Sequence, residues 1–226
     1  MTPERDQEWM RLTTASMSDL SSPDSIKIGG WLFRHRTALP LPIALAILVI
    51  PPAQTPVPLL EILAGVGLTA GGEVLRLWGV HHIGVISRTR SDRLGPLVET
   101  GPFAHVRNPL YIGNILLWVG VAITAGLLWL APIVLALLAV EYHLIVKWEE
   151  TLLSERRGDE YRDYFERVPR WLPRASRRGR DGRGGNEGSA SPASSAVSVR
   201  STLFSERGTL MAIVFGYVLL WLKARF

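Results

Sequence analysis

The sequence contains no cysteine among its 226 residues. This absence excludes disulfide bonds, zinc sites with cysteine ligands, iron–sulfur clusters and a cysteine nucleophile. Any catalysis would therefore use oxygen and nitrogen groups. Charge is missing from one long stretch as well, because no charged residue occurs between Leu110 and Val140. A stretch of this length exceeds what a single core helix of a soluble protein needs.

Apolar residues make up 47% of the chain, and they gather in separate segments. The mean hydropathy is +0.18, and the pI is near 10.0. A basic pI can indicate a nucleic-acid partner, but here the basic residues are mostly arginines placed between apolar segments, as in membrane proteins whose charges set their orientation. We therefore expect an all-α, polytopic membrane helical bundle with about 4–5 transmembrane helices and no nucleic-acid partner.

Two helices are predicted in the first third of the chain. The first would begin near Trp31 or Leu39 and end near Ile50, and the prolines around it make its span marginal. The second is expected over residues 58–80. Its charged residues are expected near the helix ends, where long side chains reach the interface at least cost; they are Glu61, Glu73 and Arg76.

The uncharged stretch predicts a helical hairpin, with its turn marked by Ala125, Gly126 and Pro132 and its second arm reaching about Glu150. Residues 155–168 then carry aromatic residues at helical spacing among charges, which predicts a short amphipathic helix on the cytoplasmic surface. The resulting division is a polar cytoplasmic tail at 1–30, a membrane core at 31–173, a disordered Arg/Gly/Ser linker at 174–205 and a hydrophobic helix at 206–226.

Charge placement predicts the orientation of this bundle. The connection at 51–58 and the hairpin tip carry no charge, whereas arginine and lysine gather in the tail, in the loop at 81–108 and after Val146. We expect these three basic segments to share the cytoplasmic side.

Two polar segments are candidates for chemistry. Residues 95–114 form a polar loop that leads into the hairpin, and the plain interpretation is a helix start with Asn108 as cap and Pro109 in the first turn. The second segment contains Glu141 and His143, which should face the bundle interior and could simply hydrogen-bond another helix. It also contains the pair formed by Glu149 and its neighbour Glu150, which opposes the helix dipole unless a cation binds there.

Glycines at 65, 67, 71 and 72 superficially suggest a nucleotide-binding loop. They follow no predicted strand and lie within an apolar helix, so we interpret them as a site of close helix packing.

The two polar segments together resemble the isoprenylcysteine carboxyl methyltransferase and phospholipid methyltransferase family. The resemblance is carried by residues 101–113, by the hairpin, by residues 149–153 and by residues 158–173, and it extends over about residues 73–173. It implies a small integral membrane enzyme that binds S-adenosylmethionine at its cytoplasmic face and methylates a lipid or small hydrophobic acceptor.

The resemblance also implies roles for individual residues. The cofactor would be bound by Gly95, Pro96, Leu97, Val98, Phe103, Asn108, Pro109, Leu110, Tyr111 and Glu149. If the acceptor is an amine, it must lose a proton, and the candidates to accept it are Glu150, Glu141 and His143. Candidates to contact the acceptor are Arg88, Arg107 and Lys147, and no metal is implied.

This sequence departs from the family pattern at two positions. Asn108 stands where the family more usually has histidine, and Ile145 stands where the eukaryotic carboxyl methyltransferases have an arginine on the substrate side. The second departure favours an amine or another lipid head group over a prenylcysteine carboxylate.

Two other classes compete with this interpretation. A sterol or steroid-type reductase with a nicotinamide cofactor has a similar Pro-x-Tyr-x-Gly stretch, but it would have Asn before the tyrosine and Glu after the glycine, where this chain has Leu110 and Asn114. A membrane adaptor would use the basic residues at 174–183 to hold anionic lipid, but it assigns no purpose to Glu141 or to the Glu149 pair.

Overall fold

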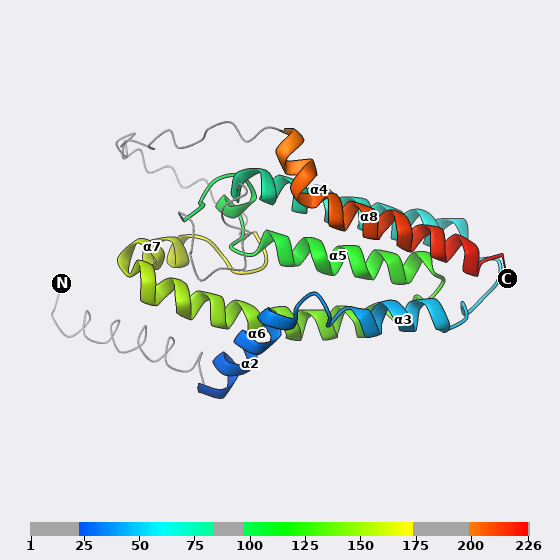
Figure 1. The fold of residues 1–226 in the computed structure, drawn as a ribbon, viewed down its shortest axis with the longest axis horizontal. Helices are drawn as coiled ribbons and strands as arrows, with labels where there is room; N and C mark the ends of the chain where they lie inside the picture. The colour runs from blue at the N-terminus through cyan, green and yellow to red at the C-terminus, as the bar shows by residue number, and fades with distance from the viewer. Residues whose placement is uncertain (1–22, 84–96, 174–198, 226) are drawn as a thin grey trace.

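The computed structural model describes residues 23–83, 97–173 and 199–225, and within these ranges the chain is helical without strands (Figure 1). The helices are α2 (Pro23–His35), α3 (Leu41–Val49), α4 (Leu59–Ile83), α5 (Pro109–Thr124), α6 (Ala131–Arg157), α7 (Asp159–Arg167) and α8 (Val199–Lys223), with a 3-10 turn, η2 (Gly101–Ala104). The all-α prediction is confirmed for the described ranges. Helices α6 and α8 are long and apolar enough to cross a membrane, and α5 is a shorter apolar helix.

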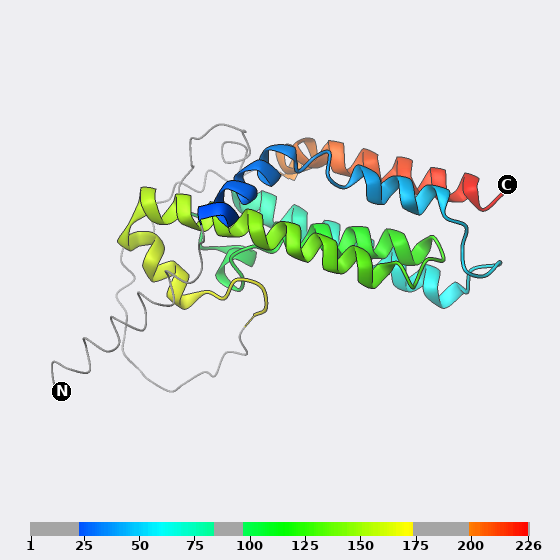
Figure 2. The ribbon, with the colours of Figure 1, turned by 90° about the horizontal axis from the view of Figure 1, so that it is seen from below.

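The long helices lie side by side in an elongated bundle, with α5 between α4 and α6 (Figures 1 and 2). Helix α8 packs on α4, and α2 packs on α6. At one end of the bundle, on the left in Figure 1, α4 and α6 end, α5 begins, and η2 and α7 lie between them. This end brings together the two polar segments that the sequence singled out.

Glycines allow α4 and α5 to approach closely. A Cβ atom on Gly72 would lie 2.6 Å from the carbonyl oxygen of Gly113, and one on Gly120 would lie 2.5 Å from that of Gly65. Neither distance is possible for a real side chain, so these positions require glycine at this helix separation. The packing interpretation is confirmed at Gly65 and Gly72, whereas Gly71 faces open space.

The hairpin forms as predicted. Gly126 supplies the turn with a φ of +73°, a conformation that favours glycine. Buried residues on both arms join one apolar core with α3, including Ile47, Leu138 and Ile145. Helix α6 runs past the expected Glu150 to Arg157, and the amphipathic helix is α7, which is shorter than predicted.

The prediction that Glu73 and Arg76 lie near helix ends is wrong. Both lie within α4, and they are only 7% and 8% exposed. The charge is accommodated because α8 supplies Glu206, whose Oε2 lies 2.7 Å from Nη2 of Arg76. The local sequence predicts these charges near the helix ends because it carries no sign of an ionic partner 130 residues away.

Two boundaries differ from those expected. Helix α2 begins at Pro23, inside the expected polar tail, and it packs so tightly that a Cβ on Gly29 would lie 2.2 Å from the carbonyl oxygen of Leu144. Helix α8 begins at Val199, so residues 199–205 are helical although the expected linker extended to 205. Residues 1–22 and 174–198, which include most of the expected tail and linker, lie outside the described residues.

Candidate functional site

Arg107 holds the loop before α5 against the chain that follows α7. Its Nη1 donates to the carbonyl oxygens of Phe165 at 2.6 Å and Val168 at 2.8 Å, and its guanidinium lies 3.9 Å above the ring centroid of Phe165. Its backbone N–H donates to the carbonyl of Pro169 at 2.9 Å. The predicted acceptor-binding residue thus has several of its donors engaged within the protein.

Glu150 accepts hydrogen bonds from two guanidinium groups. Arg107 donates through Nη2 at 2.9 Å and Nε at 3.1 Å, and Arg170 donates to the other carboxylate oxygen at 2.5 Å. These charge-assisted contacts are the stronger kind of hydrogen bond, and the carboxylate is buried. The geometry therefore gives Glu150 a structural role, in which it fastens the loop before α5 to α6, while its role as a proton acceptor stays a prediction.

Two further contacts complete this junction. The Tyr164 hydroxyl donates to the carbonyl of Phe103 at 2.9 Å, and burial raises the pKa of Tyr164 to about 12, so the hydroxyl remains a neutral donor. Asn108 precedes the first residue of α5, but its side chain makes no cap; it donates to the carbonyl of Arg170 at 3.3 Å. The segments that carry the family resemblance therefore contact each other directly.

Tyr111 and Glu149, one from each polar segment, meet beside this junction. The Tyr111 hydroxyl lies beside the Glu149 carboxylate, and Arg36 lies near enough to act electrostatically on both. The Tyr111 ring also stacks on Tyr142, with ring centroids 4.7 Å apart and planes at 25°. A carboxylate, a phenol and two stacked rings therefore lie together where α5 begins and α6 approaches its end.

Behind this group, polar side chains continue into the bundle. Asn114 lies beside the Tyr142 hydroxyl, and its Oδ1 accepts from Nη1 of Arg76. Asn114, Tyr142 and Arg76 were not predicted as part of this group, although each lies on an apolar helix where a polar side chain needs a partner. Arg36 gave no such signal, because only the fold brings it to α6.

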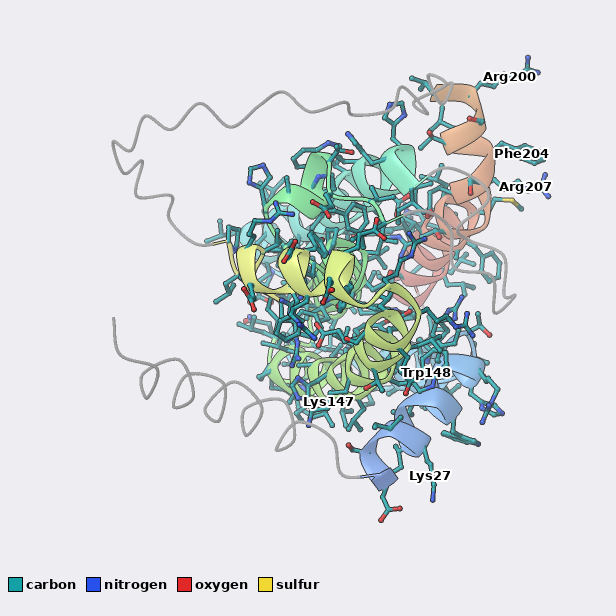
Figure 3. The ribbon with its side chains drawn as sticks, turned by 90° about the vertical axis from the view of Figure 1, so that its left-hand side faces the viewer. Lys27, Lys147, Trp148, Arg200, Phe204 and Arg207 are labelled. Carbon is teal, nitrogen blue, oxygen red and sulfur yellow. The ribbon has the colours of Figure 1, made fainter. Side chains whose placement is uncertain are left out.

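The remaining predicted residues of α6 lie on different sides of that helix. Glu141 is partly buried, and its Oε1 has no hydrogen-bond partner among the described residues. His143 lies near Lys147, Arg170 and Glu150, close enough for their charges to act on it. Figure 3 labels Lys147 on α6 away from α2, with Trp148 at the contact with α2. The expected inter-helix hydrogen bond of Glu141 is not formed in the described part of the chain.

The other predicted cofactor residues are apolar and surround the junction. Phe103 and Pro109 are buried, Leu110 packs against Gly79, and Leu97 packs on the cluster of Tyr161, Tyr164 and Val168. Val98 is partly buried. Arg88, Gly95 and Pro96 lie outside the described residues. Among the residues that the structure describes, no group of three or more His, Asp or Glu side chains is placed to hold a metal ion.

Comparison with known proteins finds a family similarity in the central part of this chain. Residues 60–160 match the sequence pattern of the phospholipid methyltransferase family. The nickel-cobalt-cadmium resistance protein NccN of Alcaligenes xylosoxydans xylosoxydans is 38% identical over 80 residues, which cover 35% of this chain and 37% of that protein. The aligned part thus spans well under half of this relative. No solved structure matches the chain.

Proposed function

Because residues 60–160 match the phospholipid methyltransferase family, we propose that this protein transfers a methyl group from S-adenosylmethionine to a lipid-borne or small hydrophobic acceptor at the membrane boundary. The observation that supports this proposal most directly is the contact between Tyr111 and Glu149. These residues come from the two segments that carry the resemblance, and the fold places them together at the end of the hairpin.

The residues at this end fit the chemical groups of the cofactor. Glu149 lies beside the Tyr111 hydroxyl, and its carboxylate has lone pairs with which to accept from an amino acid ammonium group. The stacked rings of Tyr111 and Tyr142 offer faces that attract a sulfonium cation. When bound, S-adenosylmethionine supplies an electrophilic methyl group, which an acceptor can take by direct displacement without a covalent enzyme intermediate.

The protein would contribute mainly alignment and exclusion of water. The junction around Arg107 and Glu150 fixes the loop relative to α6, so groups contributed by both can be held in one geometry. An amine acceptor must first lose a proton, and Glu141 and His143 are the candidates to take it, because the carboxylate of Glu150 is occupied by two guanidinium groups.

The acceptor is proposed to reach the site from the bilayer. The outer faces of α3, α4, α6 and α8 carry exposed leucine, valine, phenylalanine and tryptophan side chains, as expected of helices surrounded by lipid. Ile145 is fully buried in the apolar core. This position therefore offers no contact to an acceptor carboxylate, which favours an amine or another lipid head group. We further propose a multi-pass topology with the Arg107 end in the cytoplasm, because described arginines gather there, including Arg156, Arg157 and Arg170.

Isothermal titration of the purified protein with S-adenosylhomocysteine and with NADPH tests the proposal. We expect binding of S-adenosylhomocysteine, and a loss of about tenfold or more in affinity for both Tyr111→Phe and Glu149→Gln, since each removes a polar or charged group that the site offers to the cofactor. Glu155→Gln is the matched control, because this carboxylate is exposed on the same helix. Unchanged affinity in both site variants would refute the site. Binding of NADPH alone would favour a reductase, and binding of neither ligand an adaptor.

Methyl transfer from labelled S-adenosylmethionine identifies the acceptor class. Extracted membrane lipids and a farnesylcysteine derivative are offered separately, and we expect label on the lipids. Base-labile label on farnesylcysteine would reverse this choice, and label only on a water-soluble metabolite would refute access from the bilayer.

A further inference from the structure

Helix α8 lies outside the family-matched residues, yet it contacts that segment through buried polar groups. Glu206 is 0% exposed, and it binds Nη2 of Arg76 at 2.7 Å. The same Nη2 donates to the Thr209 hydroxyl at 3.1 Å. Figure 3 shows Phe204 and Arg207 on the opposite side of α8, pointing away from the bundle. The inward face of α8 therefore fixes one side of the Arg76 guanidinium.

The other side of this guanidinium contacts α5. Nη1 of Arg76 donates to Oδ1 of Asn114, and Asn114 lies close enough to the Tyr142 hydroxyl to act on it. A guanidinium is planar and rigid, so a change in the position of Nη2 also moves Nη1. Because the Asn114 oxygen is engaged by Arg76, its NH₂ group is the part left to donate to Tyr142. The position of Arg76 thus constrains Tyr142.

Tyr142 in turn supports the candidate cofactor site. It is buried, and its ring stacks on Tyr111, whose hydroxyl lies beside Glu149. An unbroken series of contacts therefore leads from Glu206 on α8 to Glu149 on α6. The first two of these contacts, from Glu206 to Arg76 and from Arg76 to Asn114, are an ion pair and a hydrogen bond, which depend on geometry more strongly than apolar packing does.

We propose that Glu206 is a positioning residue for the candidate cofactor site, and that it acts through Arg76, Asn114 and Tyr142 on Tyr111. The inference rests on the proposed function, since Tyr111 and Glu149 are there assigned to cofactor binding. It adds that the C-terminal helix is part of the working site and not only a membrane anchor.

Glu206→Gln tests the proposal, because it keeps the side-chain shape and removes the charge that holds Arg76. The matched control is Tyr217→Phe, which removes another hydrogen bond from α8 to α4, the 2.9 Å contact with Thr69, without touching Arg76. A merely structural role for α8 predicts similar effects for the two variants. A positioning role predicts an effect on the site for Glu206→Gln alone.

Two measurements on the full-length protein separate these outcomes. In calorimetry with S-adenosylhomocysteine, we expect Glu206→Gln to weaken binding by about 2- to 30-fold, the range typical of coupling through a polar network, and Tyr217→Phe to leave it unchanged. In ¹⁹F NMR without cofactor, 3-fluorotyrosine at position 111 should shift its resonance in Glu206→Gln and not in Tyr217→Phe.

Equal effects of Glu206→Gln and Tyr217→Phe would overturn the proposal. So would an unchanged affinity for S-adenosylhomocysteine in Glu206→Gln, whether or not the fluorine resonance of position 111 shifts. If the wild-type protein does not bind S-adenosylhomocysteine, the proposed function fails, and the fluorine resonance alone then decides whether Glu206 positions Tyr111. Should Glu206→Gln not fold, Thr209→Val replaces it; we expect a smaller shift of the same resonance, and no shift would overturn the proposal.

Discussion

Arg107→Ala should destabilise the protein strongly, because the side chain joins three parts of the fold. Its side chain is only 7% exposed, and the substitution removes two hydrogen bonds to Glu150 and the donor to the carbonyls of Phe165 and Val168. Breaking a buried ion pair by deleting one partner costs about 3–5 kcal/mol. Arg170 still pairs with Glu150, which lowers the free-energy cost of the substitution. The carbonyl groups of Phe165 and Val168 lose their donor, which raises this cost.

The assay is thermal unfolding of the detergent-solubilised protein, followed by circular dichroism. For a chain of this size 1 kcal/mol corresponds to about 2–4 °C, so 3–5 kcal/mol lowers Tm by roughly 6–20 °C. Arg167→Ala is the control, because this arginine pairs with Glu99 at 2.7 Å but its side chain is 61% exposed. Such an exposed pair contributes about 0–1 kcal/mol, or at most about 4 °C.

Equal Tm shifts for Arg107→Ala and Arg167→Ala would refute this reasoning. A double-mutant cycle with Glu150→Ala adds a second check, since the double variant should lose less stability than the sum of the single variants. The predicted role of Arg107 in acceptor binding gives a different result, because Arg107→Lys would then raise the KM for the acceptor without changing Tm.

Three further predictions concern packing, ionisation and topology. Gly72→Ala should lower Tm, because its Cβ would force α4 away from α5. Gly71→Ala is the control, because its Cβ would meet open space and should leave Tm unchanged or raise it. Equal losses of Tm in the two variants would contradict the packing account. The pKa of Tyr164 is raised from 10.0 to about 12 in the folded protein, so the contribution of this residue to stability is complete below about pH 10 and is lost as pH rises to about 12. Over this pH range Tm should therefore fall less in Tyr164→Phe than in the wild-type protein. In intact cells an impermeant maleimide should label Leu128→Cys at the hairpin turn and should not label Glu155→Cys near the end of α6. The chain has no cysteine of its own, so it gives no background labelling. Labelling of both variants would place the two ends of the hairpin on the same side of the membrane.

The order of helices follows from local features of the chain, so the sequence could predict it. An uncharged apolar stretch with Gly126 near its middle specifies a hairpin in any context, because the glycine supplies a positive φ at the turn. The family resemblance was likewise visible in contiguous residues, and the match over 60–160 confirmed it. The helix ends were less accurate, since α2 begins at Pro23 within the expected tail and α6 continues to Arg157.

The partners of the charged side chains required the tertiary structure. The sequence identified Arg107 and Glu150 as polar residues near a proposed site, but their mutual contact joins residues 43 positions apart. The sequence predicted Arg76 near a helix end, because nothing in the residues around Arg76 indicates the buried carboxylate of Glu206 on α8. Apolar periodicity is a local property that a short segment carries by itself. The position of a charge depends on a partner that only the folded chain brings near, because a buried charge is tolerated only where its partner is.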